Sequence, residues 1–136
     1  MDKLKKILDI KYYDYITDRK RIEFKNSVKK LYAEIKEFLK HFENENLLKT
    51  EEYYEYNRLD LKITFFNGKE VYFSKRIIFD PPGIIDDELQ ITFSENQLKI
   101  YVYKDSERWM SLFRPSWDEF NEDKFKEILI NYIEKF

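Results

Sequence analysis

The sequence contains no cysteine and a single histidine, His41. Without cysteine the chain has no disulfide framework, no thiolate nucleophile and no sulfur-ligated zinc or iron–sulfur site. One histidine is too few for a multi-histidine metal site, and a catalytic histidine needs a partner that the sequence does not reveal. We therefore interpret His41 as a solvated side chain or a partial helix cap.

Glycine and proline are also scarce, with 2 and 3 residues respectively. A P-loop or a dinucleotide-binding fingerprint needs several glycines in one loop, so neither can be built from Gly68 and Gly83. No stretch approaches the roughly 20 consecutive apolar residues of a membrane span, and the opening residues lack the apolar run of a signal peptide. We expect a cytoplasmic protein that makes no use of a membrane.

Charged and aromatic residues, in contrast, are abundant. Of the 136 residues, 43% are hydrophobic and 18% are aromatic, which is enough apolar surface to form one core without disulfides. Residues 1–136 are therefore predicted to form a single domain. Residue types with AT-rich codons (Lys, Ile, Asn, Tyr, Phe) are frequent, whereas alanine occurs once, at Ala33. This bias is typical of an AT-rich bacterial, plasmid or phage genome.

The N-terminal part of the chain has the spacing of amphipathic helices. Apolar residues recur at intervals of three and four from Val28 to Phe42, and Phe24 extends this stripe backwards. Asp18 is a candidate N-cap for the long helix. Residues 4–10 suggest a shorter helix, separated from the long one by a tyrosine-rich connection.

A C-terminal helix is indicated by a second apolar stripe, which starts at Phe125 and continues to the last residue. Two starting points compete. Ser116 with Glu119 has the spacing of a capping box, whereas Asn121 is a rival N-cap, with Phe120 and Phe125 placed to form a hydrophobic staple.

Between these helices, residues 58–75 alternate between apolar and polar side chains, as in two strands that are each buried on one face. A two-residue Asn-Gly turn would place the two apolar sets on opposite faces. A three-residue loop, Phe66-Asn67-Gly68, joins them on one face, with Gly68 at positive φ in a G1 bulge. The predicted pairs are Phe65 with Lys69, Ile63 with Val71, and Leu61 with Phe73.

Three more strands are expected in residues 89–113, after a turn that contains two prolines and Gly83. The second hairpin turns at Glu95-Asn96. Its predicted pairs are Ser94 with Gln97, Phe93 with Leu98, Ile91 with Ile100, and Leu89 with Val102.

A four-residue turn at 104–107 is predicted to lead into the last strand. Its predicted pairs are Tyr103 with Arg108, Val102 with Trp109, Ile100 with Ser111, and Leu98 with Phe113. This register buries Trp109 and Phe113, leaves Trp117 partly buried, and turns Met110 and Leu112 to the opposite face.

These elements predict an α+β fold with an antiparallel, mostly meandering sheet of about five strands. The long helix of the N-terminal half and the C-terminal helix are expected to pack on one face of that sheet.

The opposite face, called the far face below, is the main candidate for binding. By the predicted registers it carries Tyr56, Lys62, Tyr72, Gln90, Tyr101, Tyr103, Arg108, Met110 and Leu112. Tyr, Arg and Met are enriched at protein interfaces. Either a partner protein binds this face or the helix at residues 4–10 covers it. In the first case the expected binding residues are Tyr72, Tyr101, Tyr103, Arg108, Met110 and Leu112, together with Ile84 and Ile85 of the proline-containing loop.

Two groups of charged residues are also candidates for a site. Asp80, Asp86, Asp87 and Glu88 flank the proline turn, but their spacing is not that of an EF-hand, and we predict no metal. Lys25, Lys29, Lys36 and Lys40 form a basic stripe on the long helix, of the kind that contacts phosphates, although Glu34 and Glu37 dilute its charge.

The resulting hypothesis is a non-enzymatic protein-binding module without catalytic residues, metal or cofactor. It would be a small inhibitor or immunity-type protein that occludes a toxin or a component of phage or host defence, and the same surface could pair two copies in a homodimer. One alternative, less favoured by the diluted charge, is a nucleic-acid-binding protein that uses the lysine stripe and stacking tyrosines. Another is a small-ligand-binding domain with an aromatic pocket between sheet and helices.

Overall fold

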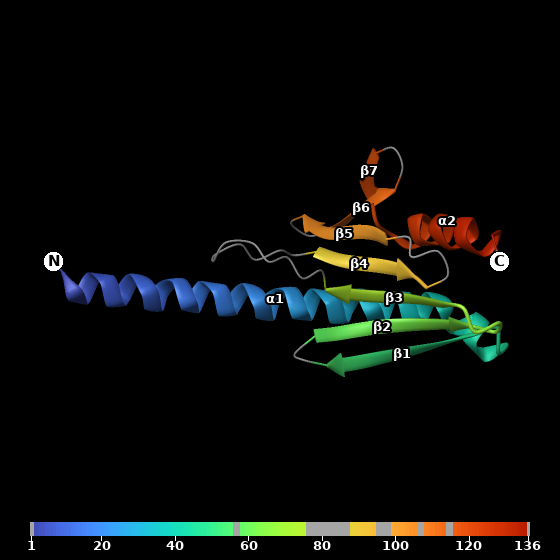
Figure 1. Ribbon diagram of the computed structural model, residues 1–136, viewed down its shortest axis with the longest axis horizontal. Coiled ribbons are helices and arrows are strands. Elements are labelled where there is room, and N and C mark those ends of the chain that lie inside the picture. Colours follow the sequence, from blue (N-terminus) through green and yellow to red (C-terminus); the bar gives the residue numbers. More distant parts are fainter. Residues whose placement is uncertain are drawn as a thin grey trace.

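A single long helix occupies the first third of the chain. The computed structural model describes residues 2–55, 58–75, 88–94, 99–105, 108–113 and 116–135, and in it α1 (Lys3–Asn44) is uninterrupted. Asp2 caps its N-terminus by accepting a hydrogen bond from the Leu4 N–H at 3.2 Å. Figure 1 shows that roughly the first half of α1 projects beyond the sheet.

The predicted separation into a short and a long helix is therefore wrong. The Asp18 carboxylate does not cap a helix but lies 3.9 Å from the Arg21 guanidinium, on the next turn of α1. The tyrosine-rich stretch between the two expected helices contains neither proline nor glycine, so nothing in it interrupts the helical hydrogen bonds.

The sheet is an antiparallel meander of seven strands, in the order β1 to β7, within the part of the chain that the structure describes. The strands are β1 (Leu48–Glu55), β2 (Arg58–Phe65), β3 (Glu70–Lys75), β4 (Glu88–Phe93), β5 (Lys99–Asp105), β6 (Arg108–Phe113) and β7 (Ser116–Glu119). The two edge strands, β1 and β7, are additional to the five expected. Edge strands are commonly rich in charged residues, and β1 carries one lysine and three glutamates among eight residues.

The predicted register of the first hairpin is confirmed. Leu61 pairs with Phe73 and Ile63 with Val71, and the Phe65 N–H donates to the Lys69 carbonyl at 2.8 Å. In the second hairpin, Ile91 pairs with Ile100 and Leu89 with Val102, also as predicted. The pairs that involve Gln97 and Leu98 lie outside the described residues.

The register predicted for β5 and β6 is wrong by two residues. Val102 pairs with Ser111, Lys104 with Trp109 and Asp105 with Arg108, so only residues 106 and 107 separate the strand ends. The shorter connection adds Lys104 and Asp105 to the ladder. A shift of two residues returns every side chain to its original face, so Trp109 is still buried in the core, with 7% of its surface exposed. The side chains of Phe113 and Trp117 lie outside the described part.

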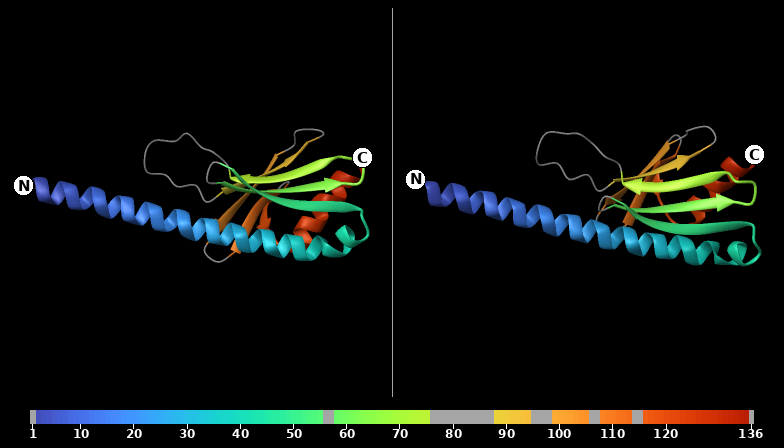
Figure 2. Two further views of the ribbon diagram at one scale, coloured as in Figure 1. Left: turned by 90° about the horizontal axis from the view of Figure 1, so that it is seen from below. Right: turned by 60° about the horizontal axis from the view of Figure 1, so that its bottom comes forward.

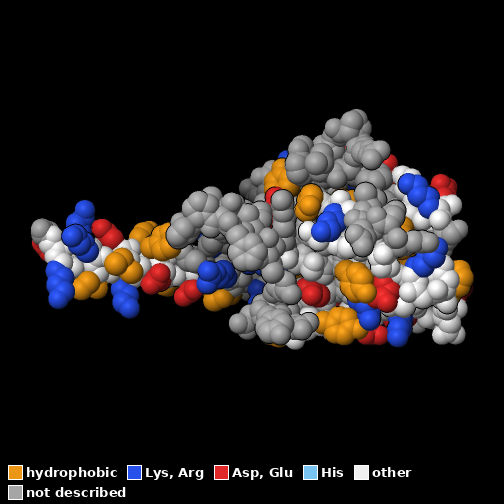
Figure 3. Space-filling view, viewed as in Figure 1, with side chains coloured by type: hydrophobic (Ala, Val, Ile, Leu, Met, Phe, Trp, Pro, Cys, Tyr) orange, Lys and Arg blue, Asp and Glu red, His pale blue; other side chains and the backbone are white. Residues whose placement is uncertain are grey.

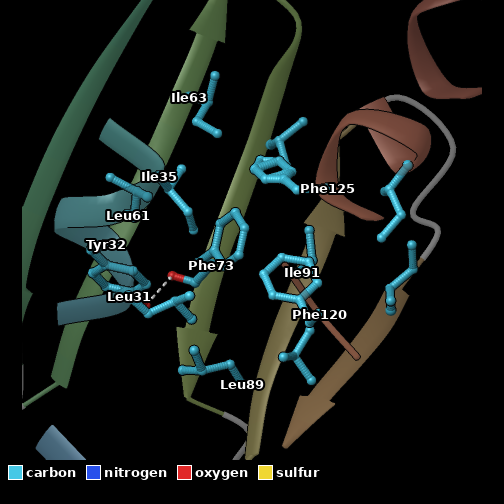
Figure 4. Packing of buried hydrophobic residues seen from close by; sticks show 14 of the residues in the cluster. Leu31, Tyr32, Ile35, Leu61, Ile63, Phe73, Leu89, Ile91, Phe120 and Phe125 are labelled. Carbon is cyan, nitrogen blue, oxygen red and sulfur yellow. Dashed lines mark hydrogen bonds between the residues drawn. The ribbon is translucent and has the colours of Figure 1, made fainter. Parts of the chain in front are cut away.

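Both helices pack on the same face of the sheet (Figure 2). On α1 the buried stripe runs from Phe24 to Leu39. The ring of Phe73 on β3 lies 5.9 Å from that of Tyr32 on α1 and 5.5 Å from that of Phe125 on α2 (Glu122–Ile133). Figure 4 shows these three rings in one cluster, so a single sheet residue contacts both helices.

The buried hydroxyl of Tyr32 also bonds to the sheet. Its single O–H is shared between the Leu59 carbonyl on β2, at 3.0 Å, and the Phe73 carbonyl on β3, at 3.3 Å. Burial raises the pKa of this hydroxyl well above its ordinary value, and the carboxylates of Asp60 and Glu52 raise it further.

Asn121 begins α2. Its side chain accepts a hydrogen bond from the Lys124 N–H at 2.9 Å, and the rings of Phe120 and Phe125 stack at 5.8 Å. Of the two starts considered, the structure selects this one, because Ser116 and Glu119 belong to β7.

We predict that Gly68→Ala lowers the free energy of unfolding by about 1 kcal/mol. Gly68 has a φ of 86°, and a methyl group placed on it would meet no atom within 4 Å, so the cost comes from the backbone alone. Gly68→Asn should cost less, because asparagine tolerates the left-handed region better than alanine. Urea unfolding of the three proteins provides the measurement, and equal losses in both variants would contradict a backbone origin of the cost.

We predict that Tyr32→Phe lowers the free energy of unfolding by about 1–2 kcal/mol, since the variant loses a buried donor to two carbonyls. Tyr54→Phe is the control, because the Tyr54 ring is exposed. Wild-type stability should also fall as the pH rises above about 10, because the unfolded chain ionises this hydroxyl first. The fall should be smaller in Tyr32→Phe, as measured by urea unfolding between about pH 8 and about pH 11. Identical pH profiles would show that Tyr32 does not contribute.

Candidate protein-interaction surfaces

The far face of the sheet brings several of the predicted binding residues together. Tyr103 on β5 pairs directly with Met110 on β6, and Tyr101 lies two residues before Tyr103 on the same face. All three side chains are half-buried. Arg108 is exposed at the start of β6, two residues before Met110. These four residues are called the β5–β6 patch below.

Carboxylates border the apolar pair of this patch. Glu88 on β4 pairs with Tyr103, and Glu119 on β7 pairs with Met110, so both lie in the same cross-strand row. In Figure 3, which shows the molecule from the side of the far face, hydrophobic side chains alternate with charged ones. An apolar centre with a polar margin is the usual anatomy of a protein contact site.

Tyr72 belongs to a different, internally bonded group on the β1–β3 part of the far face. Its hydroxyl donates to the Glu70 carboxylate, and this hydrogen bond raises the Tyr72 pKa. Lys62 lies 3.9 Å from the same carboxylate and 5.1 Å from the centre of the Tyr53 ring. A hydrogen bond with Tyr53 is the main cause of the raised Lys62 pKa. These polar groups therefore have partners within the sheet.

Three other predicted binding residues cannot be placed. The side chain of Leu112 lies outside the described part, and so do Ile84 and Ile85. Tyr56, which was also expected on the far face, is another residue that the structure does not describe.

No described helix covers the far face. α1 and α2 both pack on the opposite side of the sheet, and the residues expected to form a covering helix are the projecting first turns of α1 (Figures 1 and 2). Of the two interpretations left open by the sequence, covering by residues 4–10 is therefore wrong.

The projecting half of α1 carries an apolar stripe of its own, which sequence reasoning did not identify. Leu4, Leu8, Tyr15 and Ile22 are spaced by four and seven residues and are 66, 58, 61 and 60% exposed. At about 100° per residue, this outer stripe lies roughly 150° around the helix axis from the stripe that packs on the sheet. It therefore faces away from the core. Following the helical period through residues 11–20 without a break would have revealed it.

A groove with acidic margins lies on the helix side of the sheet, between α1, α2 and the β6–β7 edge. Its volume is about 700 Å³, and its apolar lining includes Ile35, Phe38, Trp109 and Phe125. Its charged lining consists of Glu34, Glu37 and Glu122 of the helices, together with Arg108 and Glu119, which hold far-face positions on β6 and β7 and also border the groove at this edge of the sheet. This acidic groove lies between sheet and helices, where the small-ligand alternative places its pocket. Binding of a small ligand there stays a prediction.

The lysine stripe of α1 is only partly available to a ligand. Lys25 contacts Tyr54, with its ammonium 4.4 Å from the ring centre, and Lys36 lies 3.5 Å from the Glu52 carboxylate. Lys29 and Lys40 are exposed. Two of the four ammonium groups are thus committed to β1, which reduces the positive charge that a phosphate backbone would meet.

The remaining titratable candidates form no evident site. His41 is exposed and lies 3.4 Å from Glu45. Of the acidic group near the proline turn only Glu88 is described, since Asp80, Asp86 and Asp87 lie outside the described residues. Among the residues that the structure describes, no three His, Cys, Asp or Glu side chains are placed to hold a metal ion. No described helix combines the length and apolarity needed to cross a membrane.

Comparison of the chain with protein-family models, with curated proteins and with solved structures finds no match. The candidate surfaces therefore rest on the geometry of this chain alone.

For the nucleic-acid alternative, we expect no retention of DNA or RNA in a gel shift at low salt, where phosphate contacts are strongest. The comparison variant is Lys29→Gln with Lys40→Gln, which removes the two exposed charges of the stripe. Retention by the wild type that this variant loses, and that weakens steeply with salt, would contradict the expectation.

Proposed function

We propose that this chain is a non-enzymatic protein-binding module, a small inhibitor or immunity-type protein that binds a partner and occludes the partner's own site. The supporting observation is the β5–β6 patch. Tyr101, Tyr103 and Met110 lie together on the side of the sheet that neither described helix covers. As part of the same proposal, the protein acts in the cytoplasm of a bacterium or of a phage-infected cell.

The chemistry of the patch indicates the kind of partner surface that fits it. Tyrosine side chains offer a large contact area and a hydroxyl at low conformational cost, and Arg108 can form paired hydrogen bonds at the margin. Glu88 and Glu119 lie on either side of the Tyr103–Met110 pair. A complementary partner would present an apolar side chain between lysines or arginines.

The test uses the double variant Tyr101→Ala with Met110→Ala. If the patch supplies the anchors, the variant should bind the partner more than about 2 kcal/mol, or about 30-fold, more weakly. The matched control is Ile130→Ala with Ile133→Ala, since both residues are exposed on α2, away from the far face. The partner is first captured from the cell of origin with immobilised wild-type protein, and binding is then measured with the purified pair.

Two further readouts complete the test. Thermal unfolding of the isolated double variant should remain cooperative and lie close to that of the control. The wild type should inhibit the activity of the captured protein, and the double variant should not. Capture of no protein, equal binding by both variants, or binding without inhibition would each contradict the proposed function.

A further inference from the structure

The acidic groove carries an excess of negative charge that the chain itself does not neutralise. Four carboxylates border it, against the single guanidinium of Arg108. Glu122 lies 3.8 Å from Lys126, but Glu34, Glu37 and Glu119 have no ion-pair partner in the described part of the chain. A ligand that fits the groove therefore needs positive charge together with an apolar side to contact Phe38 and Trp109.

The projecting half of α1 has this combination. Residues 3–22 contain seven lysines and arginines against three aspartates. The same segment carries the four apolar residues of the outer stripe. On the helical wheel, Lys5 and Lys11 flank the outer stripe on its two sides. Both are exposed, and neither has an ion-pair partner among the described residues.

The two features cannot meet within one chain. Residues Leu31 to Phe38 of α1 form a wall of the groove, and the outer stripe belongs to the same uninterrupted helix. Bringing the stripe into the groove would require breaking α1. A second copy of the chain faces no such restriction.

We propose that the outer stripe of one copy binds in the acidic groove of a second copy. The groove volume of about 700 Å³ suits the side chains of a turn or so of the stripe, with Lys5 and Lys11 directed towards the carboxylates. This inference does not depend on the proposed function, because the groove residues that it tests, Glu34 and Glu37, lie on α1 and not in the β5–β6 patch.

Such a contact is heterologous, since it joins two different surfaces of the same chain. The assembly is closed when two copies each place a helix in the other's groove, or when several copies form a ring. Otherwise it grows into an open chain of copies. Because unlike charges form its margin, it should weaken as ionic strength rises.

The test is a charge exchange in the full-length protein, followed by sedimentation velocity over a range of concentrations and salt. The helix variant is Lys5→Glu with Lys11→Glu, and the groove variant is Glu34→Lys with Glu37→Lys. Wild-type protein should exceed its monomer mass of 17.0 kDa as concentration rises. Each variant alone should associate at least about tenfold more weakly. An equimolar mixture of the two should recover association. The unmodified helix of the groove variant then meets the unmodified groove of the helix variant, and the acidic helix of the helix variant meets the basic groove of the groove variant.

Two controls separate this contact from a general effect of net charge and from association through the far face. Lys6→Glu with Lys20→Glu makes the same change in net charge on the opposite side of the projecting helix, and it should associate like the wild type. Tyr101→Ala with Met110→Ala should also associate normally, whether or not it binds a partner. Circular dichroism establishes that each variant is folded.

Several outcomes would overturn the proposal. These are a wild type that stays monomeric at every concentration, a groove variant that associates like the wild type, and a mixture that recovers nothing. Loss of association in the Tyr101 and Met110 variant would assign the contact to the far face instead.

Discussion

The packing of Phe73 is the contact on which the arrangement of the two helices depends. Its ring sits on the helix-facing side of β3, between Tyr32 of α1 and the stacked pair formed by Phe125 of α2 and Phe120, which precedes α2; all three ring centres lie within 6.3 Å of its own. Since aromatic rings of this size contribute much of the apolar area buried in a core, the position of each helix is tied to the same side chain. The Tyr32 hydroxyl also helps to position α1, because its hydrogen bonds to carbonyls of β2 and β3 fix where the helix lies across these strands.

Burial on one side of the sheet has consequences for the other side. The far face keeps its polar residues and orders them by bonds within the sheet, as the Glu70 interactions with Tyr72 and Lys62 show. Tyr103 and Met110 form a directly paired apolar contact on that face. The protein thus presents separate surfaces of different character: a mixed aromatic face, an acidic groove and a basic projecting helix.

The sequence predicted the elements in which apolar and polar residues recur at a regular interval. Alternation assigned the faces of β2 to β5, and matching the apolar faces of β2 and β3 selected the three-residue loop at Gly68. The same reasoning could not fix the β5–β6 register, because a shift of two residues leaves the apolar and polar faces unchanged. The edge strand β1 was missed because it carries one lysine and three glutamates and, of its described side chains, only Leu48 is buried, so it lacks a simple apolar alternation.

The misplaced helix break has a related cause. The apolar stripe of α1 changes direction near Phe24, where contact with the sheet begins, and such a change resembles the start of a new helix. It reflects a change of environment and not a break in the backbone. The far face was recognised from its composition, but the groove was not characterised, because its walls depend on how α2 packs beside α1. The bonding of Tyr72 to Glu70 likewise depends on side-chain orientations that residue types do not specify.

The projecting half of α1 should unfold locally more readily than the half that packs on the sheet. Isolated helices shorter than about 12–15 residues are marginal in water. Among the described residues, the side-chain ion pairs of residues 3–22 are all made within α1, such as those of Arg19 with Glu23 and Arg21 with Asp18. The amide protons of residues 3–22 should exchange with solvent far faster than those of Tyr32 or Leu39, whose helical turns can open only when the core itself separates. Slow exchange in the first turns would therefore report directly that something has bound there.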